Sequence, residues 1–130
     1  MSITKFIIAS LILGLSFVSC HKDAPPKATV TVVDNTGAAI VSAKVTVKVG
    51  YSNTDPKYAN TYVDPNTGLR EIVQYTGSSG VANFDFVRPS VLTAYAEYTT
   101  EYNGNTIVYT GKGILVLDEG KTFEKTIIVE

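Results

Sequence analysis

The sequence predicts an all-β fold: a single antiparallel β-sandwich of about seven strands, preceded by a cleaved signal peptide. From residue 28 onward, apolar and polar residues alternate with period two, as in strands that bury one face, and helical spacing does not persist beyond one turn. Clusters of Gly, Asn, Asp and Pro divide this alternation into short segments. A chain of 130 residues has room for one such core and too little for two.

The first 19 residues have the layout of a secretory signal. Lys5 supplies an early positive charge, residues 6–18 are almost continuously apolar, and small residues precede position 20. The apolar stretch is shorter than the roughly 20 residues that a membrane-spanning helix needs, so a permanent transmembrane anchor is the weaker interpretation. We therefore predict that residues 1–19 are removed from the mature protein.

The one cysteine of the chain, Cys20, follows this signal directly in the sequence FVSC. FVSC resembles the lipobox of bacterial lipoproteins, in which the cysteine sulfur receives a diacylglyceryl group and the new N-terminus is acylated. The resemblance implies a membrane anchor on Cys20, and several acyl chains hold a protein far more firmly than one. The alternative is an ordinary secreted protein with a lone cysteine near its cleavage site.

The polar segment HKDAPPK, residues 21–27, is stiffened by two prolines and is expected to be a tether. His21 and Lys22 replace the aspartate that retains some enterobacterial lipoproteins at the inner membrane, so the resemblance implies the outer membrane, in either leaflet. The short charged cluster is similar to the surface-export signals of Bacteroidota lipoproteins. We divide the chain into a signal peptide (1–19), a lipidated cysteine with its tether (20–27) and a sandwich domain (28–130).

Seven segments of the domain have the alternation of strands. In AKVTVKV, residues 43–49, the apolar residues fall on one face and the lysines and threonine on the other. The sixth segment could break between Gly111 and Gly113. The predicted strands are residues 28–33, 43–49, 69–76, 81–86, 91–101, 105–117 and 121–129.

Turn signals separate these strands. Asn103 and Gly104, placed between two β-rich segments, predict a two-residue hairpin turn. Other turns are predicted at DNTG (34–37), DPNTG (64–68), GSSG (77–80) and DEG (118–120).

The order of these segments is similar to that of the carboxypeptidase regulatory-like domain, a transthyretin-like, Ig-like sandwich of seven strands common in bacterial surface proteins. Ser42 and Ala43 match the family's step into its second strand. PSVL, residues 89–92, replaces the family's Pro-Gly-x-Tyr step. The resemblance spans residues 28–130 and implies the fold rather than a function, since its motifs are turn and core requirements. The family's Thr…Gly-x-Ala-x-Phe hairpin is found at Thr76, Gly80, Ala82 and Phe84.

The domain offers few groups for catalysis. The one histidine, His21, lies in the predicted tether, which excludes Ser-His and Cys-His nucleophilic systems and imidazole or thiolate zinc sites from the domain. Asp85, Glu97 and Glu101 occupy outward strand positions, where solvated charge is expected. A carboxylate pair of the kind that hydrolyses glycosides is the remaining enzymatic alternative. We predict a non-enzymatic protein with no catalytic residue, no metal and no cofactor.

Two further motifs predict no additional chemistry. DPNTG has the spacing of a calcium loop but lacks the later glutamate, so a plain turn is expected. Glu97 occupies a position similar to that of the glutamate that assists the lysine-asparagine cross-link in CnaB-type domains. The first predicted strand has no lysine and the last has no asparagine, so we predict no cross-link.

Tyrosine is the residue type that most favours a binding surface, since the chain has eight tyrosines and no tryptophan. Tyr51, Tyr58 and Tyr62 lie in an insert, residues 51–68, that is longer than ordinary hairpin loops and is either functional or disordered. Tyr95 is expected on the outer face of its strand. Such rings suit protein or sugar surfaces, and we predict these four as binding residues. The alternative is that tyrosines only cover strand edges and loop bases.

The charge of the chain is close to balanced, with a formal net charge of −1 and no basic patch, which argues against nucleic-acid binding. We expect a structural or interaction accessory lipoprotein of the bacterial envelope. It would be anchored to the membrane through Cys20 and would contact an envelope protein through strand edges or the insert. The alternative function is a surface lipoprotein that binds glycan through the tyrosines of the insert.

Overall fold

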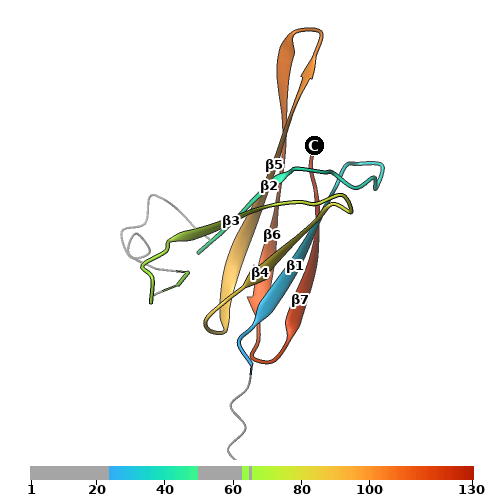
Figure 1. Cartoon of the computed structure of the whole chain (residues 1–130). Coiled ribbons are helices and arrows are strands. Elements are labelled where there is room, and N and C mark those ends of the chain that lie inside the picture. The colour runs from blue at the N-terminus through green and yellow to red at the C-terminus, as the bar shows by residue number, and fades with distance from the viewer. Residues whose placement is uncertain (1–23, 50–62, 65) are drawn as a thin grey trace, which may run out of the picture.

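The computed structural model describes residues 24–49, 63, 64 and 66–130. The predicted lipid site and the three tyrosines of the insert, Cys20, Tyr51, Tyr58 and Tyr62, lie outside the described residues. Within the described part, seven strands form two sheets and no residue is helical, which confirms the predicted all-β sandwich (Figure 1). No helix among these residues is long and apolar enough to cross a membrane.

The strands lie within two residues of the predicted segments at each end. Alternating burial explains this agreement, because β1 and β2 bury every second residue as the sequence pattern requires. The strands are β1 (Lys27–Val33), β2 (Lys44–Lys48), β3 (Glu71–Tyr75), β4 (Val81–Asp85), β5 (Ser90–Tyr102), β6 (Asn105–Leu117) and β7 (Thr122–Ile128).

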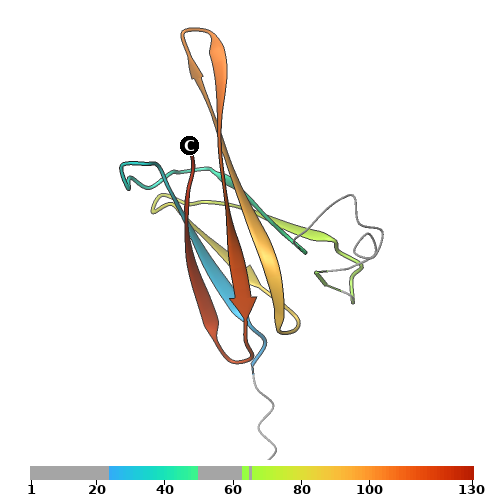
Figure 2. The same ribbon diagram turned by 180° about the vertical axis from the view of Figure 1, so that it is seen from behind.

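The two sheets have the strand orders β4-β1-β7 and β3-β2-β5-β6, and they pack face to face (Figures 1 and 2). All strand pairs are antiparallel except β1 and β7, which run parallel from Lys27↔Thr122 to Val33↔Ile128. The carbonyl of Ala24 accepts a hydrogen bond from the amide of Gly120 at 2.7 Å, so the chain enters β1 beside the β6–β7 turn and runs in the direction of β7. Period-two alternation carries no information on this direction.

The core lies between the sheets and is built from aliphatic side chains. Each fully buried Val, Leu or Ile contributes about 1.5–3 kcal/mol relative to an exposed position. Phe84 and Phe86 stack at its edge with ring centroids 6.2 Å apart. The largest fully buried aliphatic residues are Leu115, Ile127, Val30, Val32, Val45 and Val47.

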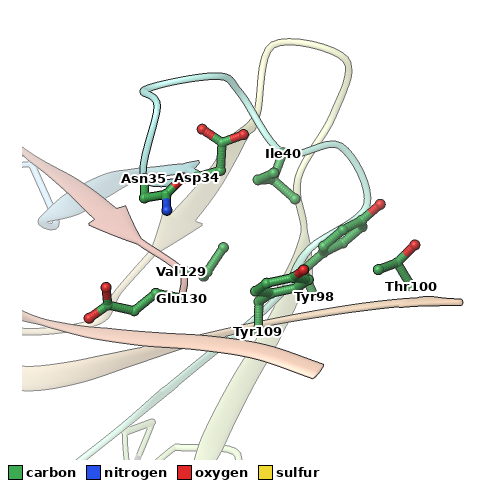
Figure 3. Close-up of a pocket in the computed structure, with 8 residues that line it drawn as sticks. All are labelled: Asp34, Asn35, Ile40, Tyr98, Thr100, Tyr109, Val129 and Glu130. Carbon is green, nitrogen blue, oxygen red and sulfur yellow. The ribbon is translucent and has the colours of Figure 1, made fainter. Parts of the chain in front are cut away.

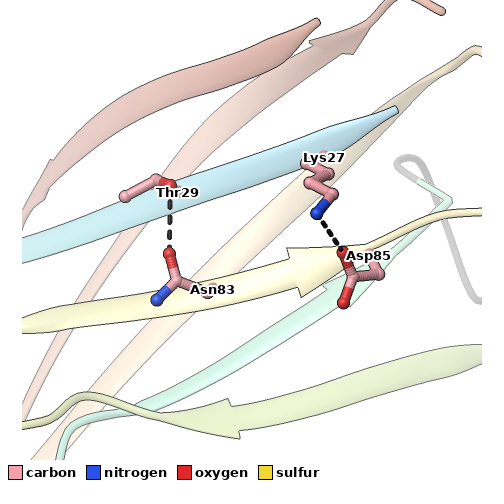
Figure 4. Close-up of polar contacts among 4 residues, drawn as sticks. All are labelled: Lys27, Thr29, Asn83 and Asp85. Carbon is pink, nitrogen blue, oxygen red and sulfur yellow. Dashed lines mark hydrogen bonds and ion pairs between the residues drawn. The ribbon is translucent and has the colours of Figure 1, made fainter. Parts of the chain in front are cut away.

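The sheet begins before the predicted domain boundary at Ala28. Pro26 is buried and its carbonyl accepts a hydrogen bond from the Phe86 amide at 3.0 Å. Lys27 belongs to β1, and its Nζ lies 3.7 Å from Asp85 Oδ1 on β4 (Figure 4). This ion pair is exposed and contributes at most about 1 kcal/mol. The backbone contacts, rather than this pair, make the end of the predicted tether part of the folded domain.

Thr76 connects two segments that are far apart in the chain. Its buried Oγ1 accepts a hydrogen bond from the Ala43 amide at 2.9 Å and donates one to the Ile40 carbonyl at 2.6 Å. The Thr76 carbonyl accepts a bond from Ser42, whose φ of 60° is rare for a residue with a side chain. These bonds hold the entry to β2 against the end of β3.

Strand β6 is continuous, so the break considered between Gly111 and Gly113 does not occur. A Cβ atom on Gly111 would overlap the carbonyl oxygen of Ile128, and one on Gly113 would lie 2.9 Å from Lys125 Cε. The glycines therefore let β7 lie directly against β6. Thr110 and Glu130 exchange two backbone hydrogen bonds of 3.2 Å at the end of this contact, where the two sheets meet.

The distal halves of β5 and β6 extend beyond the sandwich as a two-stranded ribbon, residues 98–109 (Figure 1). Strand β2 pairs with β5 only as far as Lys44↔Glu97, which leaves the ribbon without a neighbouring strand in its sheet. Asn103 and Gly104 form the tip with φ of 52° and 76° and join the pair Tyr102↔Asn105. This confirms the predicted two-residue turn, which requires positive φ at both positions.

Candidate functional site

A groove of about 440 Å³ opens at the base of the ribbon (Figure 3). Three parts of the chain supply its walls: the β1–β2 loop, the inner face of the ribbon and the segment after β7. The lining residues are Asp34, Asn35, Ile40, Tyr98, Thr100, Tyr109, Val129 and Glu130.

Two tyrosines form the floor of the groove. Tyr98 and Tyr109 face each other across β5 and β6, with ring centroids 6.4 Å apart and an interplanar angle of 23°. Both are half-buried and pack against the core. Figure 3 shows the rings side by side below Ile40, with Val129 on one side and Thr100 on the other. The groove thus presents aromatic surface flanked by aliphatic and polar groups.

The strand pattern explains why these rings lie inward. Ala94 and Ala96 are buried at the preceding inward positions of β5, and Tyr98 continues the same phase. Gly111 occupies the equivalent position beside Tyr109 on β6. These small residues allow the two sheets to pack closely below the groove. The large tyrosine rings lie where the two sheets are no longer in contact.

Asp34 is held at the edge of the groove by its own loop. Its Oδ1 accepts hydrogen bonds from the Thr36 amide at 2.8 Å, the Thr36 hydroxyl at 2.6 Å and the Ala38 amide at 3.0 Å. These bonds, the Thr36 hydroxyl first among them, lower the pKa of Asp34. Asp34 is therefore ionised at neutral pH in a fixed orientation.

The groove is acidic. Asp34 and Glu130 contribute carboxylates, Asn35 an amide and Thr100 a hydroxyl, and none of the eight lining residues is Lys, Arg or His. A glycoside-hydrolysing pair needs one carboxyl group with a raised pKa to act as the acid. Asp34 has the opposite shift, so it suits hydrogen bonding to a ligand rather than proton donation.

Tyr95, the one predicted binding tyrosine within the described residues, does not join the groove. It lies on the outward face of the four-stranded sheet, 36% exposed, with Lys48 Nζ 4.9 Å from its ring centroid. Its neighbours in phase, Ala94 and Ala96, point into the core as expected. Other exposed apolar residues of this outward face are Val73, Tyr75, Val91, Ile114 and Val116.

The polar motifs singled out in the sequence have structural roles. Asp64 Oδ1 accepts hydrogen bonds from the amides of Asn66 and Thr67, at 2.9 and 3.4 Å, which is the geometry of a turn. Glu97 lies outward on β5, opposite Lys44. No cluster of three or more potential metal-ligating His, Cys, Asp or Glu side chains occurs in the described part of the chain.

Tyr98 and Tyr109 are not among the binding residues predicted from the sequence. The alternation did contain a signal for Tyr98, since it shares the phase of Leu92, Ala94 and Ala96 in the predicted strand. Its pairing with Tyr109 depends on the register of the hairpin. The Asn103 and Gly104 turn specifies that register once the turn is known to have two residues.

Comparisons with known proteins bear on the fold of the chain. No family model matches the chain, and no curated protein matches it. A crystal structure from Pseudomonas aeruginosa, described as that of a "putative carbohydrate binding protein", has a TM-score of 0.51 and is 14% identical. The match covers 88% of this chain and 95% of that one. At this identity the likeness shows the β-sandwich fold alone.

Proposed function

We propose that this chain is a non-enzymatic carbohydrate-binding lipoprotein of the bacterial envelope, and that the groove is its binding site. The observation that carries the proposal is the half-buried pair of Tyr98 and Tyr109 beside fixed hydrogen-bonding groups. Binding sites combine apolar and aromatic surface with a few oriented polar groups. Sugars match this combination, because their C–H faces pack on aromatic rings while their hydroxyls bond to carboxylate and amide groups.

Two further observations support a sugar ligand. Tyrosine gives a large rigid contact area at low entropic cost, and its hydroxyl adds a polar contact. The structural neighbour from Pseudomonas aeruginosa carries a carbohydrate-binding description on the same fold. The proposal differs from the sequence-based alternative in its location, because it uses the groove rather than the tyrosines of the 51–68 insert.

The proposed location in the cell rests on the sequence. The signal-like residues 1–19 and the lipobox-like FVSC motif support export and lipid attachment at Cys20. We place the protein at the outer membrane on the same basis. Membership of the carboxypeptidase regulatory-like family also stays a prediction.

The expected envelope protein partner stays a prediction too, and one structural observation favours it. The outward face of the four-stranded sheet exposes apolar side chains from β3, β5 and β6, including Tyr75 at 63% and Val91 at 62%. Large exposed apolar patches are typical of protein contacts. This face and the groove lie on opposite sides of β5, so the protein could use both at once.

A glycan array followed by calorimetry with the full chain tests the carbohydrate proposal. We expect Tyr109→Ala to weaken binding of the array's best ligand by at least about tenfold, because it removes half of the aromatic floor. Asn35→Ala, at an exposed position, should weaken binding without disturbing the fold. Tyr95→Ala and the double variant Tyr58→Ala/Tyr62→Ala are matched controls that should bind normally.

Thermal denaturation of each variant separates lost binding from lost folding. Failure of the unaltered chain to bind any glycan would refute the proposal. Loss of binding in the insert variant, with normal binding by Tyr109→Ala, would move the site to the insert.

A further inference from the structure

The inner face of the ribbon continues the groove toward the ribbon tip. Tyr98↔Tyr109 at the base is followed by Thr100↔Ile107 and then by Tyr102↔Asn105. All six side chains share one face, because positions two apart along a strand point to the same side. Residues 98 to 102 span about 13 Å at about 3.3 Å per residue. The aromatic floor is thus the lower end of a longer strip.

The two faces of the ribbon differ in composition. Its outward face carries Thr99, Glu101, Thr106 and Val108, with no aromatic residue. Three of the five tyrosines in the described part of the chain lie on the inner face. Tyr102 is 67% exposed near the tip, because the three-stranded sheet does not extend over this part of the ribbon. Asn105 lies opposite Tyr102, so an aromatic cross-strand pair that would stabilise the ribbon does not account for this tyrosine.

Continuity with the groove indicates what occupies this strip. Thr100 lines the groove, which shows that the groove already extends past the ring pair in the direction of the tip. A ligand seated on Tyr98 and Tyr109 that is longer than the groove would lie along the inner face and reach Tyr102. A single sugar would leave Tyr102 without a contact.

The charges around the strip select among polysaccharides. Residues 97–110 contain two glutamates and no Lys or Arg. At the base, Asp34 and Glu130 add carboxylates, and Lys, Arg and His are missing from the groove lining. Uronate, sulfate and phosphate groups would be repelled here, whereas neutral sugars would meet hydrogen-bond acceptors.

We propose that the groove and the inner face of the ribbon together bind a neutral polysaccharide chain over several sugar units. This inference rests on the proposed carbohydrate function and specifies its ligand class. The sandwich end of the strip holds the chain between the tyrosine pair and the polar loop. Tyr102 and Asn105 contact sugar units farther along the chain.

The test uses the full chain and linear neutral oligosaccharides of one to eight units, taken from glucan, xylan, mannan and chitin. Oligogalacturonides of matched length serve as anionic probes. Calorimetry should show affinity rising with length up to several units for a neutral series and no comparable binding of the anionic series. We expect Tyr102→Ala to weaken binding of the longest neutral chain by about tenfold and to leave the shortest bound chain unaffected.

Val108→Ala, on the outward face of the same ribbon, is the matched control and should bind all lengths normally. Both positions are exposed, so neither substitution should unfold the domain. Affinity independent of length, or a Tyr102→Ala variant with normal binding of long chains, would overturn the extended site while the groove proposal stands. Preferred binding of oligogalacturonides would overturn the neutral ligand class. Absence of binding to any glycan would overturn both proposals.

Discussion

At the scale of single residues, the phase of a residue within its strand decides what its side chain can do. Tyr95 and Tyr98 are three positions apart on β5 and lie on opposite faces. Tyr95 contacts Lys48 on the outer face, whereas Tyr98 pairs with Tyr109 in the groove. The same residue type therefore belongs to two separate surfaces.

Asp34 provides a prediction at this scale that depends on pH. Its pKa is lowered in the folded chain from 3.8, so the ionised form stabilises the fold above the unfolded pKa. This contribution is lost as the pH falls below about 4 and Asp34 becomes protonated. We expect Asp34→Asn to have a lower Tm than the unaltered chain at pH 7 and a similar Tm near the acid end of the titration.

Thermal unfolding of both chains between pH 7 and pH 2 measures this difference. Asp64 has a pKa lowered by the same kind of turn, which both chains retain, so it does not enter the comparison. A Tm difference that stays constant over the whole range would contradict the role of the Asp34 charge.

At the scale of elements, the two halves of β6 have different structural roles. Its distal half forms the ribbon, and its proximal half carries the glycines against which β7 packs. Glycine is usually unfavourable in a strand interior, because it has no side chain to pack. Here the missing side chain is what allows the close approach of a second backbone.

We expect Gly111→Ala to lower the free energy of unfolding by about 1–3 kcal/mol or more, since the added methyl group would meet the Ile128 carbonyl. Gly77→Ala is the matched control. Apart from atoms of the adjacent residues, a Cβ there would have the Val81 carbonyl oxygen as its nearest neighbour, at 4.0 Å, so the change should be small. Urea denaturation of the two variants measures both values. Equal stability of the two variants would show that β6 and β7 can separate at little cost.

At the scale of the whole molecule, the start of β1 and the ribbon lie at opposite ends of the sandwich (Figure 2). Ala24 lies beside the β6–β7 turn, and the 13 residues of β6 run from the tip of the ribbon to that turn. The ribbon therefore points away from the end at which the chain enters the domain (Figure 2). If Cys20 carries the proposed lipid, the groove and the ribbon lie at the end of the domain opposite to the one at which the tether joins it.

The anchor proposal makes a prediction for the intact envelope. We expect the full chain to fractionate with membranes and to crosslink there to a specific protein, whereas Cys20→Ala should be released and lose that crosslink. Cell fractionation and affinity capture after crosslinking measure both outcomes. Release of the unaltered chain in soluble form would contradict lipid attachment. Capture of the same protein by Cys20→Ala would show that the contact does not depend on anchoring.

The sequence by itself determined the fold class, the number of strands, their approximate limits and the Asn103 and Gly104 turn. These features are local, because alternation and turn chemistry act over a few residues. The sequence also indicated tyrosine as a candidate binding residue, but the tyrosines predicted from it were those of the insert and Tyr95.

Only the tertiary structure decided which tyrosines share the groove. The parallel pairing of β1 with β7, the continuity of β6 through Gly111, and the groove between Asp34, Tyr98 and Val129 all join residues far apart in the chain. Alternation reports which residues of one strand share a face. It does not report which strands meet, because that depends on how the two sheets pack.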